Sequence, residues 1–400
     1  MPGWSDVLSK EEMLDVAAWL RGLGYLESPE YEPVGVEGRP SSPDIERGRE
    51  IFGELCSECH GEEGRGDGRK RLRDDWGVRT WPRNLTKGWT YRMGPSVEEI
   101  YRRVTIGIPG TQMPSFADRE SRKYLDEKER WAVAEYTATL VDPEKEPSGE
   151  TVVSAAGAAR LPSAPDDPAW EGVPQVSFFL APQLIEGERL FRPTLDSVTV
   201  RAVYNDTGVA LLMEWDDRTE SVPGDKRAED VAGGPVARDM GAVQFPREVS
   251  GTGRKPYFGM GDEKRPVDIW LWKGPAGPGE AGEVEAVTAR GSGDLSRKEA
   301  EGLEAAGEYS DGTWRVVFRR DFSEAGRGVF REGEFIPVAF AAWDGSNAEG
   351  GSRHTMTPWY NLRLTKDRGP GVWAWPLAAG AAVAAAEFFL FITVRREGSG

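Results

Sequence analysis

The stretch LCSECHG, residues 55–61, decides the fold of the first half of this chain. It holds both cysteines of the 400 residues, Cys56 and Cys59, and His60 follows directly. This C-x-x-C-H spacing is the pattern of covalent c-type haem attachment. Two thiols bond the two vinyl groups of one haem, and the histidine that follows becomes an iron ligand. A redox-active cysteine pair or half a zinc site is the alternative, but no second cysteine pair exists to complete a zinc site.

The other axial ligand of the iron is expected downstream, in the stretch IGIPGTQMPSF at 106–116. Met113 lies there in a glycine-rich loop, and methionine–histidine ligation raises the potential of a haem. A short helix is predicted over 97–104 and a closing helix over 126–140, because apolar residues recur at helical spacing. The segment therefore predicts a small helical haem domain with His60 and Met113 as the iron ligands.

Residues 42–142 resemble the class I cytochromes c. The resemblance includes PRNLT at 82–86, which in such domains runs along the haem edge near a propionate. It implies that Pro82 lies beside the haem and that Arg83 and Arg92 form salt bridges with the propionates. The alternative is that both arginines are simply solvated.

The N-terminal segment repeats the closing helix. LSKEEMLDVAAWLRGL (8–23) aligns with LDEKERWAVAEYTATL (125–140) without gaps, and Ser9 with Glu12 forms a capping-box pattern. We therefore expect residues 1–25 to be the C-terminal remnant of a preceding cytochrome c domain, with Met1 as an internal axial methionine. A stray amphipathic helix is the alternative. An in-frame stop codon close upstream, with no C-x-x-C-H, would contradict the remnant.

The second half has a different pattern. Residues 143–170 are rich in Pro, Ala, Ser and Glu and are predicted to be a linker. Short apolar stretches of period two then indicate an antiparallel β-sandwich over 171–366, with hairpin turns at 205–208 and 311–312. Strands are expected at 176–180, 197–204, 209–215, 241–245, 267–272, 284–289, 313–319, 336–342 and 359–364. The net charge of −17 argues against a general nucleic-acid binder, and no hydrolase motif is present.

Four phrases of this half carry a second resemblance. They are ARDMGAVQFP (237–246), PYFGMGDEKRPVDIWLWKG (256–274), FAAWDGSN (340–347) and GGSRHTMTPWYNLRL (350–364). Together they resemble the haem b (gamma) subunits of the type II dimethyl-sulfoxide-reductase family, which includes ethylbenzene dehydrogenase, dimethylsulfide dehydrogenase, and selenate and chlorate reductases. The resemblance covers about residues 165–366.

The resemblance implies a β-sandwich that holds one haem b between a methionine and a lysine. The methionine position matches Met260, and His354 stands about where the lysine is expected. Neutral imidazole is a common haem ligand, whereas a lysine amine must first lose its proton. Lys273 is the alternative second ligand, and Met213 and Met240 are the alternative methionines.

The C-terminal region predicts a membrane anchor. Residues 372–394 carry a single charge, Glu387, and about 20 apolar residues suffice to span a bilayer. Arg395 and Arg396 follow, so the positive-inside rule places the C-terminus in the cytoplasm and the large domains on the periplasmic or extracellular side. A buried Ala-rich helix is the alternative.

These features together predict a multidomain protein. It has an all-α cytochrome c domain with haem c, an antiparallel β-sandwich with haem b, and a C-terminal transmembrane helix. The resemblances imply a non-catalytic electron-transfer subunit that serves iron–sulfur and molybdenum catalytic subunits and a soluble cytochrome or oxidase. The rival interpretations are a cytochrome c joined to a carbohydrate-binding sandwich, a cytochrome subunit of a respiratory oxidase or quinol complex, and an enzyme with a catalytic sandwich.

Overall fold

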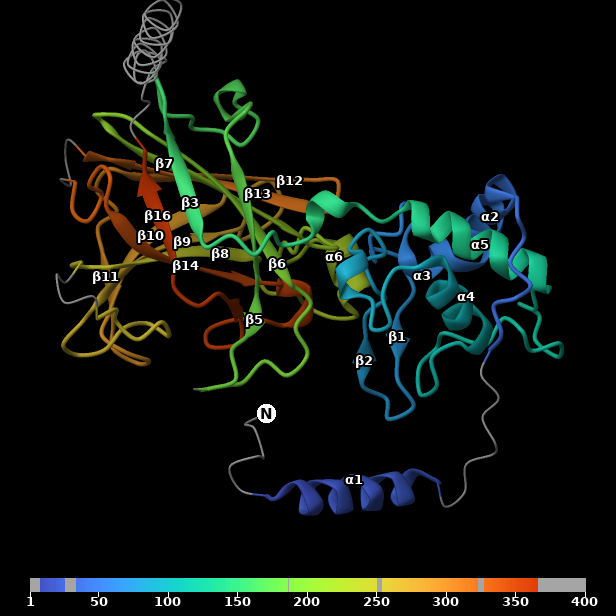
Figure 1. Ribbon diagram of the computed structural model, residues 1–400. Helices are drawn as coiled ribbons and strands as arrows, with labels where there is room; N and C mark the ends of the chain where they lie inside the picture. Colours follow the sequence, from blue (N-terminus) through green and yellow to red (C-terminus); the bar gives the residue numbers. More distant parts are fainter. Residues whose placement is uncertain (1–7, 26–33, 186, 250–253, 323–326, 366–400) are drawn as a thin grey trace, which may run out of the picture.

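The computed structural model describes residues 8–25, 34–185, 187–249, 254–322 and 327–365. Within these ranges the chain forms a small, mostly helical region and a large region made mostly of strands (Figure 1). The prediction of a multidomain chain with these two kinds of structure is therefore confirmed.

The helical region follows the predicted pattern. The short helix expected over 97–104 and the closing helix expected over 126–140 are both present. The region's helical segments are α2 (Ile45–Ile51), a π-helical turn (Phe52–Cys56), α3 (Ser57–His60), a 3-10 turn (Gly88–Thr90), α4 (Val97–Ile106) and α5 (Glu127–Thr139). The prediction of an all-α domain was wrong in one respect, because β1 (Leu72–Arg73) and β2 (Arg79–Thr80) form a short antiparallel pair.

The closing helix α5 organises the core of this region. Asp126 and Glu129 form a capping box at its first turn, which satisfies backbone N–H groups that would otherwise lack partners. Trp131 is fully buried and stacks on Tyr101 of α4, with ring centroids 3.8 Å apart. Phe52 packs against Tyr136 on the other side of α5. These contacts fix the helices around the segment that carries the two cysteines.

The N-terminal helix α1 (Lys10–Tyr25) has the same start as α5. The amide of Ser9 donates to the carboxylate of Glu12, and the amide of Glu12 donates to the Ser9 hydroxyl, so the predicted capping box is present. Leu14, Val16 and Trp19 are exposed. Residues 1–7 lie outside the described ranges, so the domain-remnant hypothesis, with Met1 as an axial ligand, stays a prediction.

The large region contains a continuous 14-stranded hydrogen-bonded sheet that folds back on itself. Its main strand order is β11-β10-β9-β8-β14-β16-β3-β6-β7-β13-β12. The nine predicted strands are all present, as β4 (Gln175–Phe179), β6 (Ser197–Tyr204), β7 (Gly208–Asp216), β8 (Met240–Pro246), β9 (Val267–Lys273), β10 (Glu283–Ala289), β13 (Thr313–Asp321), β14 (Phe335–Trp343) and β16 (Tyr360–Leu364). The sequence prediction missed β3 (Val152–Gly157), β5 (Ala181–Pro182), β11 (Leu295–Lys298), β12 (Leu303–Ser310) and β15 (Thr355–Met356).

The segment predicted as a linker, 143–170, is not a simple linker. Its strand β3 pairs in parallel with both β16 and β6, so the prediction was wrong for this part, and the region is not purely antiparallel. The Pro- and Ser-rich flanks concealed a six-residue strand with alternating buried positions. Its side chains Val153 and Ala155 are fully buried, which gives the strand its place in the sheet.

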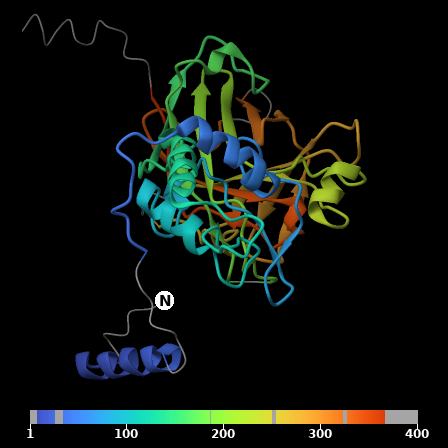
Figure 2. The same ribbon diagram turned by 90° about the vertical axis from the view of Figure 1, so that its right-hand side faces the viewer.

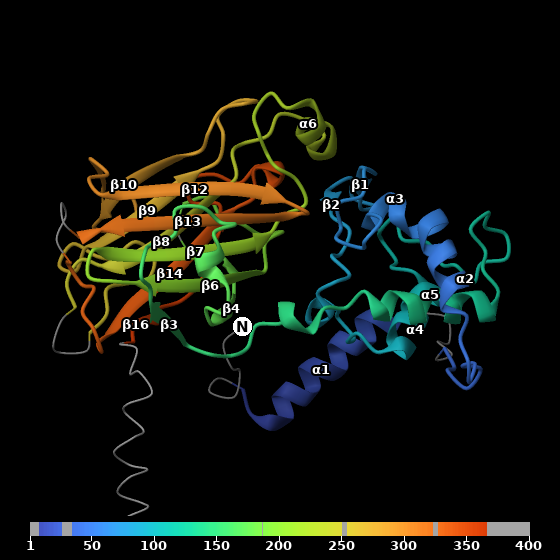
Figure 3. The same ribbon diagram turned by 90° about the horizontal axis from the view of Figure 1, so that it is seen from above.

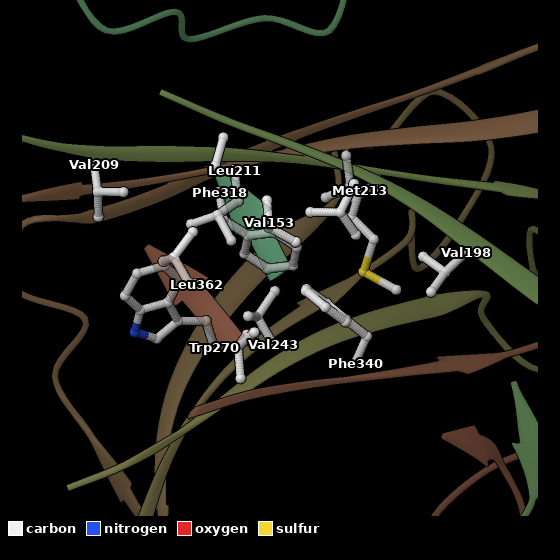
Figure 4. Close-up of a cluster of buried hydrophobic side chains, with 14 of the residues drawn as sticks. Val153, Val198, Val209, Leu211, Met213, Val243, Trp270, Phe318, Phe340 and Leu362 are labelled. Atoms are coloured by element: carbon white, nitrogen blue, oxygen red, sulfur yellow. The ribbon is translucent and has the colours of Figure 1, made fainter. Parts of the chain in front are cut away.

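The main apolar core lies between the two layers of the folded sheet (Figure 4). Leu211 and Phe318 enter it from β7 and β13, and Val243, Trp270 and Phe340 enter it from β8, β9 and β14. Such a core is the main favourable term in the stability of a two-layer β-structure.

The predicted membrane span, 372–394, falls outside the described residues. Within the part of the chain that the structure describes, no helix is both long and apolar enough to cross a membrane.

Candidate haem sites

The attachment motif lies where three helical segments meet. The π-helical turn Phe52–Cys56 leads directly into α3, which ends at His60, and π-turns are frequent at functional sites. Both cysteines are free thiols and are half-buried. A side chain at Gly68 would approach the carbonyl oxygen of Cys59 to 2.2 Å, so the following loop packs closely over the motif. Half-buried cysteines at this spacing, followed by a histidine, fit covalent haem attachment.

His60 is oriented by the segment that the sequence singled out as PRNLT. Its Nδ1 lies 3.0 Å from the carbonyl oxygen of Arg83, so a proton on Nδ1 donates to that carbonyl and leaves the Nε2 lone pair for iron. Burial lowers the pKa of His60, with the Arg83 carbonyl opposing this shift, so the imidazole is neutral near neutral pH. The contact places the 82–86 segment beside His60, and its role along the haem edge stays a prediction.

Met113 lies on the loop between α4 and α5. Its amide donates to the Thr111 hydroxyl, and its carbonyl accepts from the amide of Ile108. Gly107 holds this loop, because it has φ +76° and a Cβ there would lie 2.5 Å from the Pro114 carbonyl carbon. The role of Met113 as the second iron ligand of haem c stays a prediction.

The residues expected along the haem edge are near the motif. The Pro82 carbonyl oxygen would lie 2.9 Å from a Cβ at Gly66, so the 82–86 segment packs against the loop after the motif. Arg83 and Arg92 are both exposed, and no ion pair joins either of them to another described residue. Their side chains are therefore free to pair with propionates, and that role stays a prediction.

The strand-rich region contains a second candidate site, a mostly apolar cavity that is partly open to solvent. Met260 and His354 both line it, although they come from separate loops. Its described lining residues are Gln183, Ile185, Tyr257, Phe258, Gly259, Met260, Ser292, Ser352, His354 and Met356. An apolar wall with a thioether and an imidazole is the chemistry that a non-covalent haem requires.

Met260 adopts an unusual backbone conformation. Its φ is +71°, a left-handed value that residues other than glycine rarely adopt and that clusters at functional sites. The turn is held in place because the amide of Gly261 donates to the Tyr257 carbonyl and the Gln244 side chain donates to the Phe258 carbonyl. The fold therefore presents Met260 on a well-anchored turn.

His354 is buried and packs against the ring of Trp343, with centroids 4.7 Å apart. Its Nδ1 lies 3.2 Å from the carbonyl oxygen of Gly351, so a proton on Nδ1 leaves the lone pair of Nε2 for a metal. Burial lowers the pKa of His354 to about 4, with its backbone hydrogen bonds opposing the shift. The side chain is therefore neutral at physiological pH, and its role as a haem b ligand stays a prediction.

The alternative ligands lie elsewhere. Lys273 is on β9, where its Nζ is 2.5 Å from Glu285, and it does not line the cavity. Met213 is fully buried in the sheet core (Figure 4), and Met240 begins β8 away from the described cavity wall. Met356 does line the cavity, and the sequence prediction missed it. The sequence offered one signal for Met356: it lies two residues after His354, and residues at this spacing in a strand lie on the same face.

The two regions touch through a polar junction. Figure 2 shows the helical region in front of the sheet region. The Nζ of Lys87 lies 2.6 Å from Asp196 and 3.1 Å from Asp216 of the sheet region. Burial alone would lower the pKa of Lys87, but Asp216 and Asp196 raise it above its ordinary value. Trp81, the residue before Pro82, donates from its Nε1 to the side-chain oxygen of Asn347 at 3.1 Å.

Arginines strengthen the same junction. Arg79 and Arg218 lie over the Trp81 ring, at 3.6 and 4.0 Å from its centroid. The β1–β2 pair lies beside α6 (Lys226–Ala232) in Figure 3, and Arg71 donates to the Asp230 carbonyl at 2.9 Å. The regions are thus joined by specific contacts in addition to the chain connection.

Comparisons with known proteins agree with this division. The family described as "Cytochrome C oxidase, cbb3-type, subunit III" matches residues 43–136, and the family described as "Ethylbenzene dehydrogenase" matches residues 167–284 and 280–355. A cytochrome c domain carries haem c, so the haem c prediction is confirmed.

Two relatives are similar to more than half of this chain. The dimethylsulfide dehydrogenase subunit gamma of Rhodovulum sulfidophilum is 30% identical over 53% of this chain and 78% of that protein. A Haloferax mediterranei protein provisionally named as a respiratory nitrate reductase haem subunit is 27% identical over 56% of this chain and 75% of that protein.

A solved carbohydrate-binding module of family 9 from Caldicellulosiruptor kristjanssonii is only 8% identical, with a TM-score of 0.29 over 55% of this chain and 97% of that one. A likeness this low carries no argument for sugar binding. The chain belongs to the ethylbenzene dehydrogenase family, as a haem-carrying electron-transfer subunit of the gamma type joined to a cytochrome c domain.

Proposed function

We propose that this chain holds haem c on Cys56, Cys59 and His60 and haem b between Met260 and His354, and that it passes electrons between them. The observation that carries the proposal is that Met260 and His354, the two expected ligands, line the same cavity. Bound haem supplies the one-electron redox chemistry, and the chain supplies ligands, an apolar pocket and orientation.

The junction between the regions supports transfer within the chain. Trp81 adjoins the haem-edge segment, and its hydrogen bond reaches Asn347 of the sheet region. Asn347 is close in sequence to Trp343, whose ring packs on His354. We propose that this series of contacts couples the two haems.

The partners follow from the family. We propose that haem b exchanges electrons with an iron–sulfur subunit attached to a molybdenum catalytic subunit, and that haem c exchanges them with a soluble cytochrome or an oxidase. Support comes from the dimethylsulfide dehydrogenase gamma relative, which is itself one subunit of an enzyme complex.

We also propose that residues 372–394 anchor the chain in the cell membrane, with the large domains on the periplasmic or extracellular side and the C-terminus in the cytoplasm. The support is the apolar sequence and the arginines that follow it. Expression with and without residues 372–400, followed by carbonate extraction of membranes, tests this. Equal release of both forms would contradict the anchor.

A pyridine haemochrome spectrum of the purified, fully matured chain tests the two-haem proposal. We expect equal amounts of haem b and haem c. His354→Ala is expected to lose only haem b, and Cys56→Ser with Cys59→Ser only covalent haem. Met93→Ala, at an exposed methionine, is the matched control and should keep both haems. Haem c alone, in haem-supplied protein whose sheet region is folded by circular dichroism, would contradict the haem b assignment.

A further inference from the structure

Three buried carboxylates meet at the edge of the sheet region, outside both haem sites. Asp217 follows β7, Asp239 precedes β8, and Asp344 follows β14. One carboxylate oxygen from each lies within 4.8 Å of the others, and the three residues are 3%, 0% and 0% exposed. Since β7 and β8 belong to facing layers, the cluster joins the two layers of the sheet.

Two of these carboxylates are well provided with hydrogen bonds. Asp239 accepts from the amides of Ser221 and Gly345, each at 2.7 Å, and from Trp314 Nε1 at 2.9 Å. The oxygens of Asp344 also accept several hydrogen bonds, from Thr194 Oγ1, from the amide and hydroxyl of Ser346 and from the Asn347 amide.

Asp217 differs from them. Its Oδ2 is buried and has no hydrogen-bond partner among the described residues, although the side chain is almost wholly removed from solvent. A buried carboxylate oxygen without a partner costs free energy unless a ligand or ion satisfies it. This orphaned oxygen is an observation independent of the clustering, and it belongs to one of the three clustered carboxylates.

The charge at the cluster also needs compensation. Asp217, Asp239 and Asp344 are almost wholly removed from solvent, so their ionised forms require a cation close by. Glu349, whose carboxylate accepts from the Asp344 amide, adds a further buried acid. Arg218, the next residue in the chain, is a cation beside Asp217.

The donor set selects a class of ion. It consists of carboxylate oxygens, with the hydroxyls of Thr219 and Ser221 close by, 3.1 Å from each other. Hard oxygen donors without sulfur or imidazole suit calcium-like cations. A small polar pocket, partly open to solvent, lies at the junction and is lined by Asp217 and Asp344 together with Lys87 and Arg65 of the helical region.

We propose that Asp217, Asp239 and Asp344 bind one divalent cation of the calcium class at this edge. The cation ties the ends of three strands together beside the junction with the cytochrome c domain. The proposal goes beyond the haem functions and does not depend on either haem.

Terbium(III) is the test ion, because it replaces calcium and its emission is excited through nearby tryptophan. Trp314 donates directly to Asp239, so bound terbium is expected to emit when tryptophan is excited. The full matured chain, stripped of metal by a chelator, is titrated with terbium and then with calcium. We expect saturation at one site, displacement of terbium by calcium, and a higher thermal unfolding temperature with calcium.

Asp217→Asn is nearly isosteric and removes one charge, so it should weaken terbium and calcium binding by about tenfold or more. Asp206→Asn, at a carboxylate whose side chain is 97% exposed, is the control and should bind as the wild type does. If Asp217→Asn does not fold, elemental analysis of wild-type protein purified in calcium tests the proposal instead. We expect about one calcium ion per chain.

Two results would overturn the proposal. One is the absence of calcium-displaceable emission in the wild type, which would mean that the three acids share protons. The other is equal binding by the Asp217→Asn and Asp206→Asn variants. Haem content is recorded on the same samples, so a missing haem b with intact calcium binding would contradict only the proposed haem function.

Discussion

The Nζ of Lys87, in the cytochrome c domain, lies 2.6 Å from the carboxylate of Asp196 in the sheet domain, and Asp216 approaches the same ammonium to 3.1 Å. Lys87 is 3% exposed, whereas the side chains of Asp196 and Asp216 are 34% and 17% exposed, so a buried ammonium pairs with two partly buried carboxylates. Attraction in the interior repays the cost of removing the charges from water only when the geometry is good. The two domains therefore depend on this contact for a defined relative position.

Lys87→Met should loosen the domain junction. Removing one partner of a buried pair leaves an uncompensated charge, and we expect a loss of about 3 kcal/mol in the free energy of unfolding. Lys145, 3.0 Å from Asp216, limits the loss. Chemical unfolding of the haem-loaded chain measures the change. Lys298→Met, at a more exposed pair, is the control and should cost less than about 1 kcal/mol; equal losses would contradict the role of Lys87.

Acid should destabilise the haem-free chain through His354. Its pKa falls from 6.5 to about 4 on folding, so the unfolded chain binds the proton first as the pH is lowered. Stability from the neutral imidazole is present above pH 6.5 and is lost between pH 6.5 and 4. The expected loss is about 3 kcal/mol.

Carboxylates also titrate in this pH range, so the contribution of His354 is measured as the difference between the wild type and a variant without the imidazole. Unfolding free energies of wild type and His354→Gln, both haem-free, are compared at pH 7 and pH 4.5. The wild type should lose more stability on acidification than the variant. Parallel pH profiles would show that His354 is not buried in its neutral form.

The cavity offers two methionines, and their substitution distinguishes them. Met260→Leu should remove the sulfur ligand of haem b and shift its reduction potential and absorption spectrum, because the axial ligand sets both. Met356→Leu should leave the spectrum unchanged and affect only packing. Spectra and redox titrations of both variants decide the matter, and a spectral change confined to Met356→Leu would transfer the role to that residue.

Trp81→Phe should slow electron transfer between the haems while both haems stay bound. The variant keeps an aromatic ring for Arg79 and Arg218 but loses the hydrogen bond to Asn347. Flash photoreduction of one haem, followed by observation of the other, measures the rate. Trp76→Phe, at a tryptophan that is 82% exposed, is the matched control. An unchanged rate in Trp81→Phe would remove this contact from the route.

Gly107→Ala should disturb the Met113 loop. The substitution puts a side chain 2.5 Å from the Pro114 carbonyl carbon at a φ of +76°, and an L residue is strained there. We expect a loss of more than about 1 kcal/mol in the free energy of unfolding and a lower potential of haem c, if Met113 ligates its iron. Gly77→Ala is the control, because Gly77 has the same positive φ but no atom within 4 Å of an added Cβ. It therefore shows the effect of backbone strain without a steric clash. If haem c has the same reduction potential in the Gly107→Ala and Gly77→Ala variants, Met113 is not a ligand of its iron.

The sequence alone determined the local features. A covalent haem site needs two thiols and a histidine at fixed spacing, so LCSECHG was sufficient to place it. The sequence also predicted the strands with period-two patterns and the helices with capping boxes, because these patterns involve residues close together in the chain. β3 was missed because it is stabilised by pairing with β6 and β16, which lie far away in the sequence.

Only the tertiary structure decided what meets across long separations. It brought Met260 and His354 to one cavity, added Met356, and set Lys273 apart in an ion pair with Glu285. It also gathered Asp217, Asp239 and Asp344, which have no recognisable spacing. The physical reason is that such sites form where the ends of strands and their loops converge, and chain folding, not sequence proximity, sets those distances.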